Sequence, residues 1–385
     1  MSVRIAFIGT GSRGTSLLQE ALRHPDVQVP ALCDTNVENL NRAAEVVERS
    51  RGSRPELSPD CRPVLTRDDV DAIVIATPQE DHAAIAVQAM RAGKFAASEV
   101  PACTTLDECH ELVRAHEEGG SGYMLLENCC YWKHVMQVQR MIEAGLFGEL
   151  TYARCGYVHD CRSLRFNPDG TLTWRGENTV NYVGDLYPTH GFGPVCQWLG
   201  INRSDRLVSL VSMSSKSAAH NVYAAERFGE DHPAAKIEWA NGDTTCTLVR
   251  TAQGRLIEIR YDTASPRPPA VGPYALQGTK GAYEHAFSEH KVYMEGRSPG
   301  HAWEPLDGYE EEFRHPYWRE RGDEALKAGH DGGDYFVISD FLDAIRTGVS
   351  PIDVYDAVTW SVIRPLSAES ILAGGKTVEV PDFKV

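Results

Sequence analysis

The chain opens with VRIAFIGTGSRG, residues 3–14, in which an apolar run of strand length meets three glycines. Gly9, Gly11 and Gly14 form the pattern G-x-G-x-x-G, and a helical stretch follows them. A second apolar run then ends at Asp34. A strand, a glycine turn, a helix and an acidic residue in this order are typical of a turn that binds a dinucleotide. The first glycine permits the tight turn, the second lets the backbone approach a pyrophosphate, and the third lets the helix pack on the strand.

The residue types in this turn favour NAD over NADP. The helix that begins after Gly11 offers unbonded N–H groups and the positive end of its dipole to the phosphates. Asp34 can accept hydrogen bonds from both ribose hydroxyls, and its charge would repel a 2′-phosphate. The alternative is a glycine-rich turn in some other α/β protein, which leaves the coincidence of strand, helix and acid unexplained. We therefore predict an NAD site.

Length and charge restrict the class of protein. At 385 residues the chain is too long for one ordinary core, so we expect two domains. Its 42% apolar and 24% charged residues are those of a soluble globular protein. The formal net charge of −16 argues against nucleic acid and anionic membranes as partners. No apolar run approaches the ~20 residues of a membrane span, and a strand at residue 3 leaves no room for a signal peptide.

The ten cysteines indicate neither disulfides nor a structural zinc site. They include no C-x-x-C pair, and the cluster His159, Asp160 and Cys161 lacks a recognisable ligand spacing. We therefore expect reduced thiols, a cytoplasmic location and no metal site.

The order of expected elements predicts the fold class, α/β followed by α+β. Strands and helices alternate over the first ~125 residues, which indicates a Rossmann domain with a parallel sheet, residues 1–128. Segments in which apolar and polar residues alternate then follow, among them 235–240. They predict that residues 129–385 form a second domain with a large, mostly antiparallel sheet flanked by helices. Helices are expected at 333–347 and 353–373. One open sheet face would need covering, so we expect a homo-oligomer through this sheet.

Polar residues follow the predicted strands of the first domain. Thr77, Pro78 and His82 come after one strand, Glu99 after the next, and Asn128 after the last. Ligands of Rossmann sheets bind at the carboxyl ends of the strands, so these side chains should face the cofactor and the substrate. Each could instead be a helix cap or a structural hydrogen bond.

These motifs resemble the Gfo/Idh/MocA superfamily of glucose–fructose oxidoreductase and inositol dehydrogenase. The resemblance rests on the segments 9–14, 76–82 and 92–101. In most of that superfamily a lysine that assists hydride transfer stands at the position of Val100. A valine cannot carry a proton, so the usual alcohol dehydrogenase mechanism is not expected here.

Further motifs are similar to those of glycoside hydrolase family 109, the NAD-dependent hexosaminidases typified by α-N-acetylgalactosaminidase. The motifs are EVP at 99–101, EN at 127–128 with Tyr131, GDLYPTHG at 184–191, QGTKG at 277–281 and GHDGGDY at 329–335. The resemblance runs from residue 3 to about residue 380. It implies a glycosidase that acts on an N-acetylhexosaminide or a related glycoside, a small sugar ligand, and NAD as a recycled catalyst.

The resemblance also implies roles for individual residues. The implied cofactor contacts are Ser12, Arg13, Asp34, Gln79 to His82, Glu99, Val100, Asn128 and Tyr187. The implied sugar contacts are Tyr157, Arg175 and the segment from Tyr187 to His190. A further sugar-binding tyrosine of the family follows a Ser-Pro-Arg-Pro stretch. Here Pro269 follows that stretch and Tyr274 is the nearest tyrosine, so this contact is missing or moved.

His190 and Tyr187 are the candidate catalytic residues. They lie three apart with Pro188 between them, so a stiff turn presents both. Histidine suits proton abstraction near neutral pH, and tyrosine can relay the proton. In the implied reaction, transient oxidation at C3 acidifies the C2 proton, elimination across C1–C2 expels the leaving group, water adds, and C3 is reduced again. Such a cycle does without the paired carboxylates of ordinary glycosidases. Whether His190 acts at C2 or at C3 stays open.

Two other functions remain alternatives. One is an NAD-dependent sugar or cyclitol oxidoreductase that consumes NAD, against which Val100 weighs. The other is a non-catalytic NAD-bound sugar-binding protein, against which the pair of Tyr187 and His190 weighs. Divergence over 158–174 keeps the second alternative open.

Overall fold

The computed structural model describes residues 2–119 and 121–384, which form two compact units. The first unit comprises Met1–Trp132 and Pro316–Ser361, and the second comprises Lys133–His315 and Val362–Val385. This organisation differs from the predicted single boundary after residue 128. The chain returns to the first unit because helix α12 (Gly333–Thr347) packs beside α1 (Ser12–Leu22), and helix α13 (Val354–Ser361) packs beside α5 (Leu106–Gly119).

The sheet of the first unit is parallel, as predicted, and has the order β4-β3-β1-β5-β6-β7, with β2 beside β1. Its strands are β1 (Val3–Ile8), β2 (Val27–Gln28), β3 (Ala31–Cys33), β4 (Glu56–Ser58), β5 (Ala72–Ile75), β6 (Phe95–Ser98) and β7 (Tyr123–Leu125). Strand β5 is buried throughout, as expected for an apolar strand covered on both faces. The strand order reverses between β1 and β5, so ligands should bind where these two strands end.

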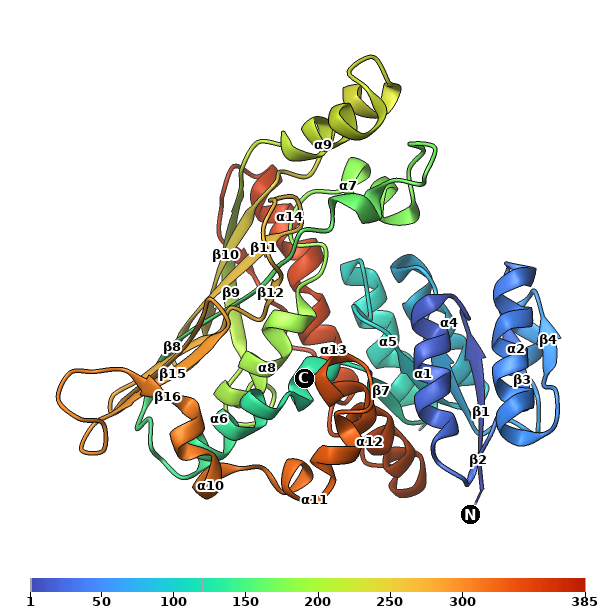
Figure 1. The fold of residues 1–385 in the computed structure, drawn as a ribbon, viewed down its shortest axis with the longest axis horizontal. Helices are drawn as coiled ribbons and strands as arrows, with labels where there is room; N and C mark the ends of the chain where they lie inside the picture. Colours follow the sequence, from blue (N-terminus) through green and yellow to red (C-terminus); the bar gives the residue numbers. More distant parts are fainter. Residues whose placement is uncertain (1, 120, 385) are drawn as a thin grey trace. The chain divides into compact units, whose positions relative to one another are not determined.

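Helices connect the parallel strands of the first unit (Figure 1). They are α1 (Ser12–Leu22), α2 (Val37–Arg51), α3 (Cys61–Leu65), α4 (Gln79–Arg91), α5 (Leu106–Gly119) and the 3₁₀ turn η1 (Asn128–Tyr131). The returning segment adds α11 (Pro316–Ala325), η5 (His330–Gly332), α12 (Gly333–Thr347) and α13 (Val354–Ser361). The helix expected over 353–373 is two helices, α13 and α14 (Ile363–Leu372), which belong to different units.

The second unit is built on a ten-stranded, mostly antiparallel sheet, which confirms the predicted fold class. Its order is β16-β15-β14-β13-β8-β11-β10-β9-β17, with β12 beside β8. The strands are β8 (Leu150–Val158), β9 (Leu207–Ser214), β10 (Thr245–Thr251), β11 (Leu256–Asp262), β12 (Ala270–Val271), β13 (Ala275–Gly278), β14 (Gly281–Ala286), β15 (Glu289–Met294), β16 (Glu304–Pro305) and β17 (Val378–Glu379). Burial alternates strictly along β10, so one sheet face packs inward and the other is open.

Helices of the second unit are α6 (Lys133–Glu143), α7 (Trp174–Asn181), α8 (Thr189–Leu199), α9 (Ala219–Phe228), α10 (Glu310–Phe313) and α14 (Ile363–Leu372), with 3₁₀ turns η2 (Arg162–Arg165), η3 (Pro233–Lys236) and η4 (Leu306–Tyr309). The strand predicted at 235–240 is wrong, because this segment continues irregularly from η3. Its apolar residues instead pack with Phe166 and α9 in a small satellite core that holds Trp239.

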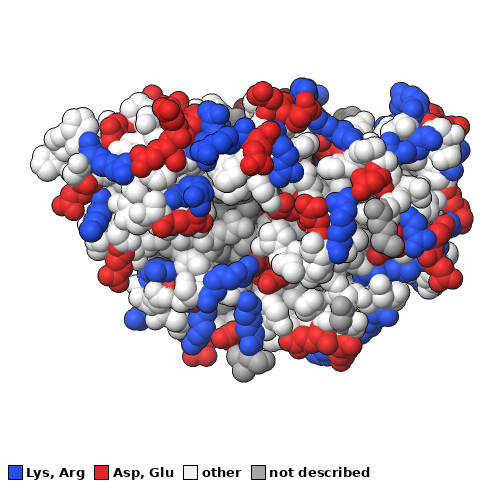
Figure 2. Space-filling view, turned by 90° about the horizontal axis from the view of Figure 1, so that it is seen from below, with Lys and Arg blue, Asp and Glu red and all other residues white. Residues whose placement is uncertain are grey.

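Charged side chains of both signs are interspersed over the face drawn in Figure 2. Within residues 2–119 and 121–384, no helix has the length and apolar character needed to cross a membrane.

Candidate functional site

Two of the three glycines in the turn after β1 are required by the turn itself. A Cβ on Gly9 would lie 2.5 Å from the carbonyl oxygen of Ala76, and Gly9 has a φ of +87°. A Cβ on Gly14 would lie 1.9 Å from the carbonyl oxygen of Gly9. A Cβ on Gly11, by contrast, would meet only Asn39 Nδ2, at 3.9 Å, among the described residues. The space beside Gly11 is therefore available to a ligand, at the position where a pyrophosphate approaches such turns.

The polar groups around this turn suit a dinucleotide. Helix α1 has Gly11 as its N-cap and no side-chain cap, so its first amides have no acceptor within the helix. They carry the positive end of the helix dipole, which favours an anion. At the end of β5, Thr77 Oγ1 is a buried hydroxyl that lacks a hydrogen-bond partner among the described residues. Such a group costs free energy unless a ligand or a water completes it.

Asp34 is held beside the glycine turn in a fixed orientation. Its Oδ2 accepts a hydrogen bond from the amide of Thr10 at 2.7 Å, and its Oδ1 accepts one from the amide of Asn36 at 2.8 Å. The carboxylate is half-buried, so its negative charge is only partly screened by solvent. This charge suits a ribose diol and opposes a 2′-phosphate, in agreement with the predicted preference for NAD.

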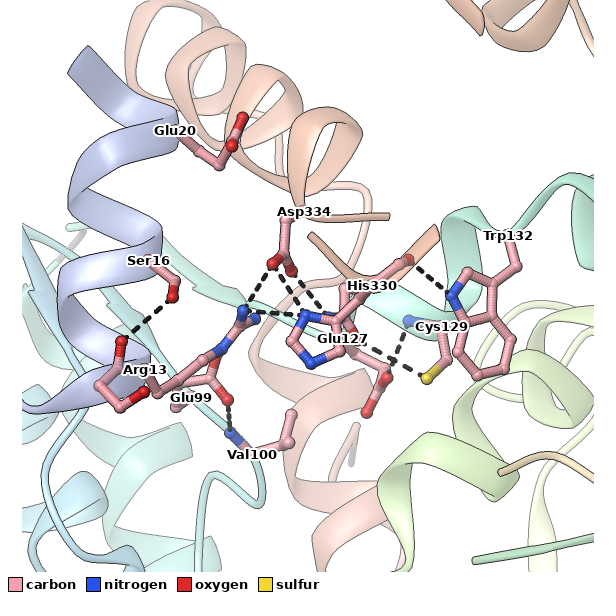
Figure 3. Close-up of polar contacts among 12 residues, drawn as sticks. Arg13, Ser16, Glu20, Glu99, Val100, Glu127, Cys129, Trp132, His330 and Asp334 are labelled. Carbon is pink, nitrogen blue, oxygen red and sulfur yellow. Dashed lines mark hydrogen bonds and ion pairs between the residues drawn. The ribbon is translucent and has the colours of Figure 1, made fainter. Parts of the chain in front are cut away.

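A buried ionic network centred on Asp334 supports the start of α1 (Figure 3). Arg13 donates from Nε to Glu99 Oε1 at 2.6 Å and from Nη1 to Asp334 Oδ2 at 2.7 Å. Asn128 Nδ2 donates to Asp334 Oδ1 at 2.7 Å, and His330 Nδ1 lies 2.8 Å from Asp334 Oδ2. The network thereby joins the first turn of α1, the end of β6, η1 and α12.

The charges in this network stabilise one another. Burial alone would raise the pKa of Asp334, but hydrogen bonds from His330 and Arg13 outweigh it and hold that pKa far below its usual value. Burial likewise opposes the charge of Arg13, yet Glu99 and Asp334 raise the pKa of the guanidinium. The hydrogen bond to Asp334 raises the pKa of His330 above 6.5. An ionised Asp334 beside the charged Arg13 is therefore the stable state near neutral pH.

These contacts define what several predicted cofactor residues do within the protein. Arg13, Glu99 and Asn128 point at one another or at Asp334, so they shape the site through the network. Asp334 lies in the motif GHDGGDY at 329–335, but the sequence alone assigned it no role. The nitrogens of His82 face the carbonyl oxygens of Pro101 at 2.8 Å and Thr77 at 2.9 Å. His82 thus connects the turn after β5 to the turn after β6, and both of its ring nitrogens are engaged with backbone carbonyl groups.

The other predicted cofactor residues occupy the ends of the same strands. Val100 is buried directly after Glu99 and offers no titratable group. Pro78 is the N-cap of α4, and Gln79 is buried in the first turn of that helix. Ser12 opens α1, where its amide is among those without an intrahelical acceptor.

The second unit brings the candidate proton-transfer residues together. The ring centroids of Tyr187 and His190 lie 4.9 Å apart in an edge-on arrangement. Tyr157, at the end of β8, lies 5.0 Å from Tyr187 and 5.7 Å from His190 by the same measure. Three side chains that can donate or relay protons therefore form one cluster.

Two glycines make this cluster possible. A Cβ on Gly191 would lie 2.6 Å from the backbone nitrogen of Gly156, so α8 rests directly on β8. This close approach places Tyr157 and His190, the chain neighbours of the two glycines, side by side. Tyr274 is fully buried, and its hydroxyl donates to the carbonyl oxygen of His190 at 2.6 Å. The tyrosine nearest to the missing sugar contact is therefore a support for His190.

A carboxyl group that sequence reasoning did not single out lies beneath Tyr187. Asp185 is 2% exposed, and its Oδ1 accepts a hydrogen bond from the amide of Tyr187 at 3.0 Å. Its own amide donates to Ser367 Oγ at 2.9 Å. Burial raises the pKa of Asp185 to about 7. A carboxyl group that titrates near neutrality beside candidate catalytic residues is a typical feature of active sites.

The remaining predicted sugar contact, Arg175, lies against a tryptophan. Arg175 is exposed on α7, and its guanidinium lies 4.1 Å from the ring centroid of Trp174. The cluster His159, Asp160 and Cys161 borders Tyr157, with Cys161 Sγ 3.4 Å from His159 Nδ1.

The fold and the glycine turn define an NAD-binding protein with a Rossmann domain. Residues 3–126 match the family model "Oxidoreductase family, NAD-binding Rossmann fold", which confirms the predicted cofactor. Among solved structures, a levoglucosan dehydrogenase in complex with NADH is similar with a TM-score of 0.80 and 20% identity, over 99% of this chain and 100% of that one. An aldose-aldose oxidoreductase from Caulobacter crescentus reaches a TM-score of 0.71 at 16% identity, over 99% and 100%. These identities show the fold alone.

The remainder of the chain identifies the family more closely. Residues 131–385 match the model "Glycosyl hydrolase 109, C-terminal domain". A glycosyl hydrolase family 109 protein from Stenotrophomonas maltophilia is 39% identical over 99% of this chain and 89% of its own length. An α-N-acetylgalactosaminidase from Tannerella forsythia is 36% identical over 99% and 86%. The chain belongs to glycosyl hydrolase family 109, as the sequence motifs predicted.

Proposed function

We propose that this protein is an NAD-dependent glycosidase that cleaves an N-acetylhexosaminide, with an α-N-acetylgalactosaminide as the first substrate to test. The observation that carries the proposal is the cluster of Tyr157, Tyr187 and His190, which supplies proton-transfer groups without a pair of opposed carboxylates. The relative from Tannerella forsythia, named α-N-acetylgalactosaminidase, supports this choice of sugar.

The first unit would hold the cofactor. The amides at the start of α1 would bind the pyrophosphate beside Gly11, Asp34 would bind a ribose diol, and Thr77 Oγ1 would gain a partner. Bound NAD supplies a hydride acceptor and donor for the sugar. Val100 contributes no proton, so the acid–base work falls to other residues.

The second unit would hold and move the protons. His190 is the candidate base for the hydroxyl proton at C3 or for the proton at C2, and Tyr187 is its partner. Asp185 keeps the amide of Tyr187 in place, and Tyr274 keeps the carbonyl of His190 in place. Tyr157 and the exposed Arg175 remain proposed sugar contacts. General acid–base assistance of this kind contributes about 10²–10⁴ in rate per group.

One assay tests the proposal. The purified protein is incubated in D₂O with p-nitrophenyl N-acetyl-α-galactosaminide and NAD well below the substrate concentration. We expect many turnovers per NAD, with deuterium at C2 of the released sugar. NADH formed in proportion to substrate, with the glycoside intact, would instead identify an ordinary dehydrogenase and contradict the proposal.

A matched pair of variants tests the role of His190. His190→Ala should still bind NAD but lose turnover, whereas His301→Ala removes an exposed histidine and should keep it. Full turnover by His190→Ala would remove His190 from the mechanism.

We further propose a homo-oligomer that forms through the open sheet face, and a cytoplasmic location. Met213, Leu248 and Leu256 are exposed apolar side chains on strands β9, β10 and β11. Covering such a surface is favourable. Leu248→Glu should lower the mass measured by light scattering, whereas Leu326→Glu, an exposed leucine outside the sheet, should not. None of the ten cysteines forms a disulfide bond, which is compatible with a reducing compartment.

A further inference from the structure

Three histidines converge in the second unit, away from the cluster of Tyr157, Tyr187 and His190 in sequence. His134 comes from the first turn of α6, His285 from β14 and His290 from β15. One ring nitrogen of each lies within 4.8 Å of the other two. The ring centroids of His285 and His290 are 4.0 Å apart, and those of His134 and His290 are 4.2 Å apart.

The sheet register explains this convergence. Strands β14 and β15 form an antiparallel hairpin in which His285 and His290 are directly opposite one another. Residues that are opposite in such a pair project from the same face of the sheet. The sequence spacing could not reveal the group, because His134 precedes the hairpin by about 150 residues and joins it only through tertiary packing.

Hydrogen bonds orient two of the rings as they are oriented in metal sites. His285 Nδ1 lies 2.7 Å from the carbonyl oxygen of Gly272, which can only accept, so this nitrogen carries the proton. The Nε2 of His285 therefore presents its lone pair. His290 Nδ1 lies 2.8 Å from the hydroxyl of Tyr283. Metal-binding histidines usually have their second nitrogen fixed in this way by a carbonyl or another polar group.

Each of the three histidines can offer one ring nitrogen to the same ion. A neutral imidazole is a ligand for Zn²⁺, Cu²⁺, Ni²⁺ and Co²⁺ at neutral pH.

We propose that His134, His285 and His290 form a site for a divalent transition metal ion of the zinc class, with water as the fourth ligand. Tetrahedral zinc with nitrogen ligands at about 2.0–2.1 Å places those nitrogens about 3.4 Å apart, so the rings would close slightly around the ion. The sequence predicts no metal site, and these three histidines lie outside the cluster of His159, Asp160 and Cys161. The alternative is that the three rings only pack together.

The site would support the candidate catalytic cluster. The ring of Tyr274 lies 6.1 Å from that of His134, and its hydroxyl donates to the carbonyl oxygen of His190. An ion that joins α6 to the β14–β15 hairpin would therefore hold His134 in place against Tyr274, the residue that donates to the carbonyl oxygen of His190. This makes the ion structural, and its binding can be tested without the glycosidase reaction.

The experiment uses the full, tag-free chain after treatment with a chelator. The protein is titrated with Co²⁺, and visible ligand-field absorption and metal content after desalting are recorded. We expect about one ion per chain, displacement by Zn²⁺, and a higher unfolding temperature with metal, because binding to the folded state alone stabilises it. Absence of these changes in the unmodified chain would overturn the proposal and indicate simple packing of the rings.

Variants assign the ion to the three histidines. His290→Asn and His285→Asn should each lose uptake, while His301→Gln, which changes an exposed histidine elsewhere, should keep it. Circular dichroism checks that each variant is folded before uptake is compared. Full uptake by folded His290→Asn and His285→Asn would place the ion elsewhere and contradict the assignment.

Discussion

Gly191 at the start of α8 rests on Gly156 in β8 so closely that a Cβ on Gly191 would lie 2.6 Å from the Gly156 nitrogen. Their chain neighbours His190 and Tyr157 are side by side for this reason, with ring centroids 5.7 Å apart. The geometry of the candidate catalytic cluster thus depends on two residues that have no side chains of their own.

Gly191→Ala should therefore abolish turnover although no polar group is removed. The added methyl group must displace α8 from β8, and overpacking of this kind costs about 1–3 kcal/mol. Chemical denaturation and the glycosidase assay measure the two effects. Gly308→Ala is the control, because a Cβ there would meet nothing within 4 Å. Normal turnover by Gly191→Ala would show that the close approach is not needed.

Asp334→Asn should destabilise the first unit and weaken NAD binding. The substitution keeps the shape but leaves Arg13 and His330 without their shared anion, and breaking a buried ion pair costs about 3 kcal/mol. Calorimetric NAD titration and denaturant unfolding check both effects. Asp343→Asn, on the same helix, removes an exposed ion pair with Arg346 and should change little. Equal results for the two variants would contradict the role of Asp334.

The ion pair between His330 and Asp334 predicts a pH dependence of stability. The pKa of His330 is raised in the folded state, so its stabilisation is complete below about 6.5 and is lost as pH rises through the raised pKa. Thermal unfolding from mildly acidic to mildly alkaline pH should show this loss, and His330→Gln should lack that part of the slope. The ring is half-exposed, so the effect should shrink in high salt. A His330→Gln profile parallel to that of the unmodified chain would refute this prediction.

Asp185 predicts a second, separate pH dependence. Its pKa is raised from 3.8 to about 7 by burial, so ionisation opposes folding, and stability falls as pH rises from about 4 to 7. The full difference is of order 4 kcal/mol at 1.36 kcal/mol per pKa unit. Asp185→Asn should remove this slope while its amide oxygen still accepts from Tyr187. Unfolding measured at several pH values tests the slope, and an unchanged slope would show that Asp185 does not titrate in this range.

The sequence predicted the parts of the site that are local along the chain. The glycine turn, Asp34 and the helix that begins after Gly11 are consecutive, and their physical requirements can be read from residue types alone. The same holds for Tyr187 and His190, which a single turn presents. The helix at 333–347 was predicted with its exact bounds because it is capped by glycines at both ends.

Contacts between distant segments were beyond such reasoning. The strand predicted at 235–240 has strand-like residues, but they are used in a satellite core with Trp239. The predicted helix over 353–373 is divided because its halves pack in different units. Propensity and periodicity describe neighbours along the chain, and tertiary packing overrides them.

The sequence by itself determined the Rossmann fold of the first unit, the preference for NAD and the family, because each depends on short motifs with local physical meaning. Only the tertiary structure decided that Arg13 is bound to Asp334, that Tyr274 supports His190, and that Asp185 titrates near neutrality. It also brought His134 to the hairpin of His285 and His290. Burial and charge pairing depend on which distant segments meet, and no spacing along the chain encodes that directly.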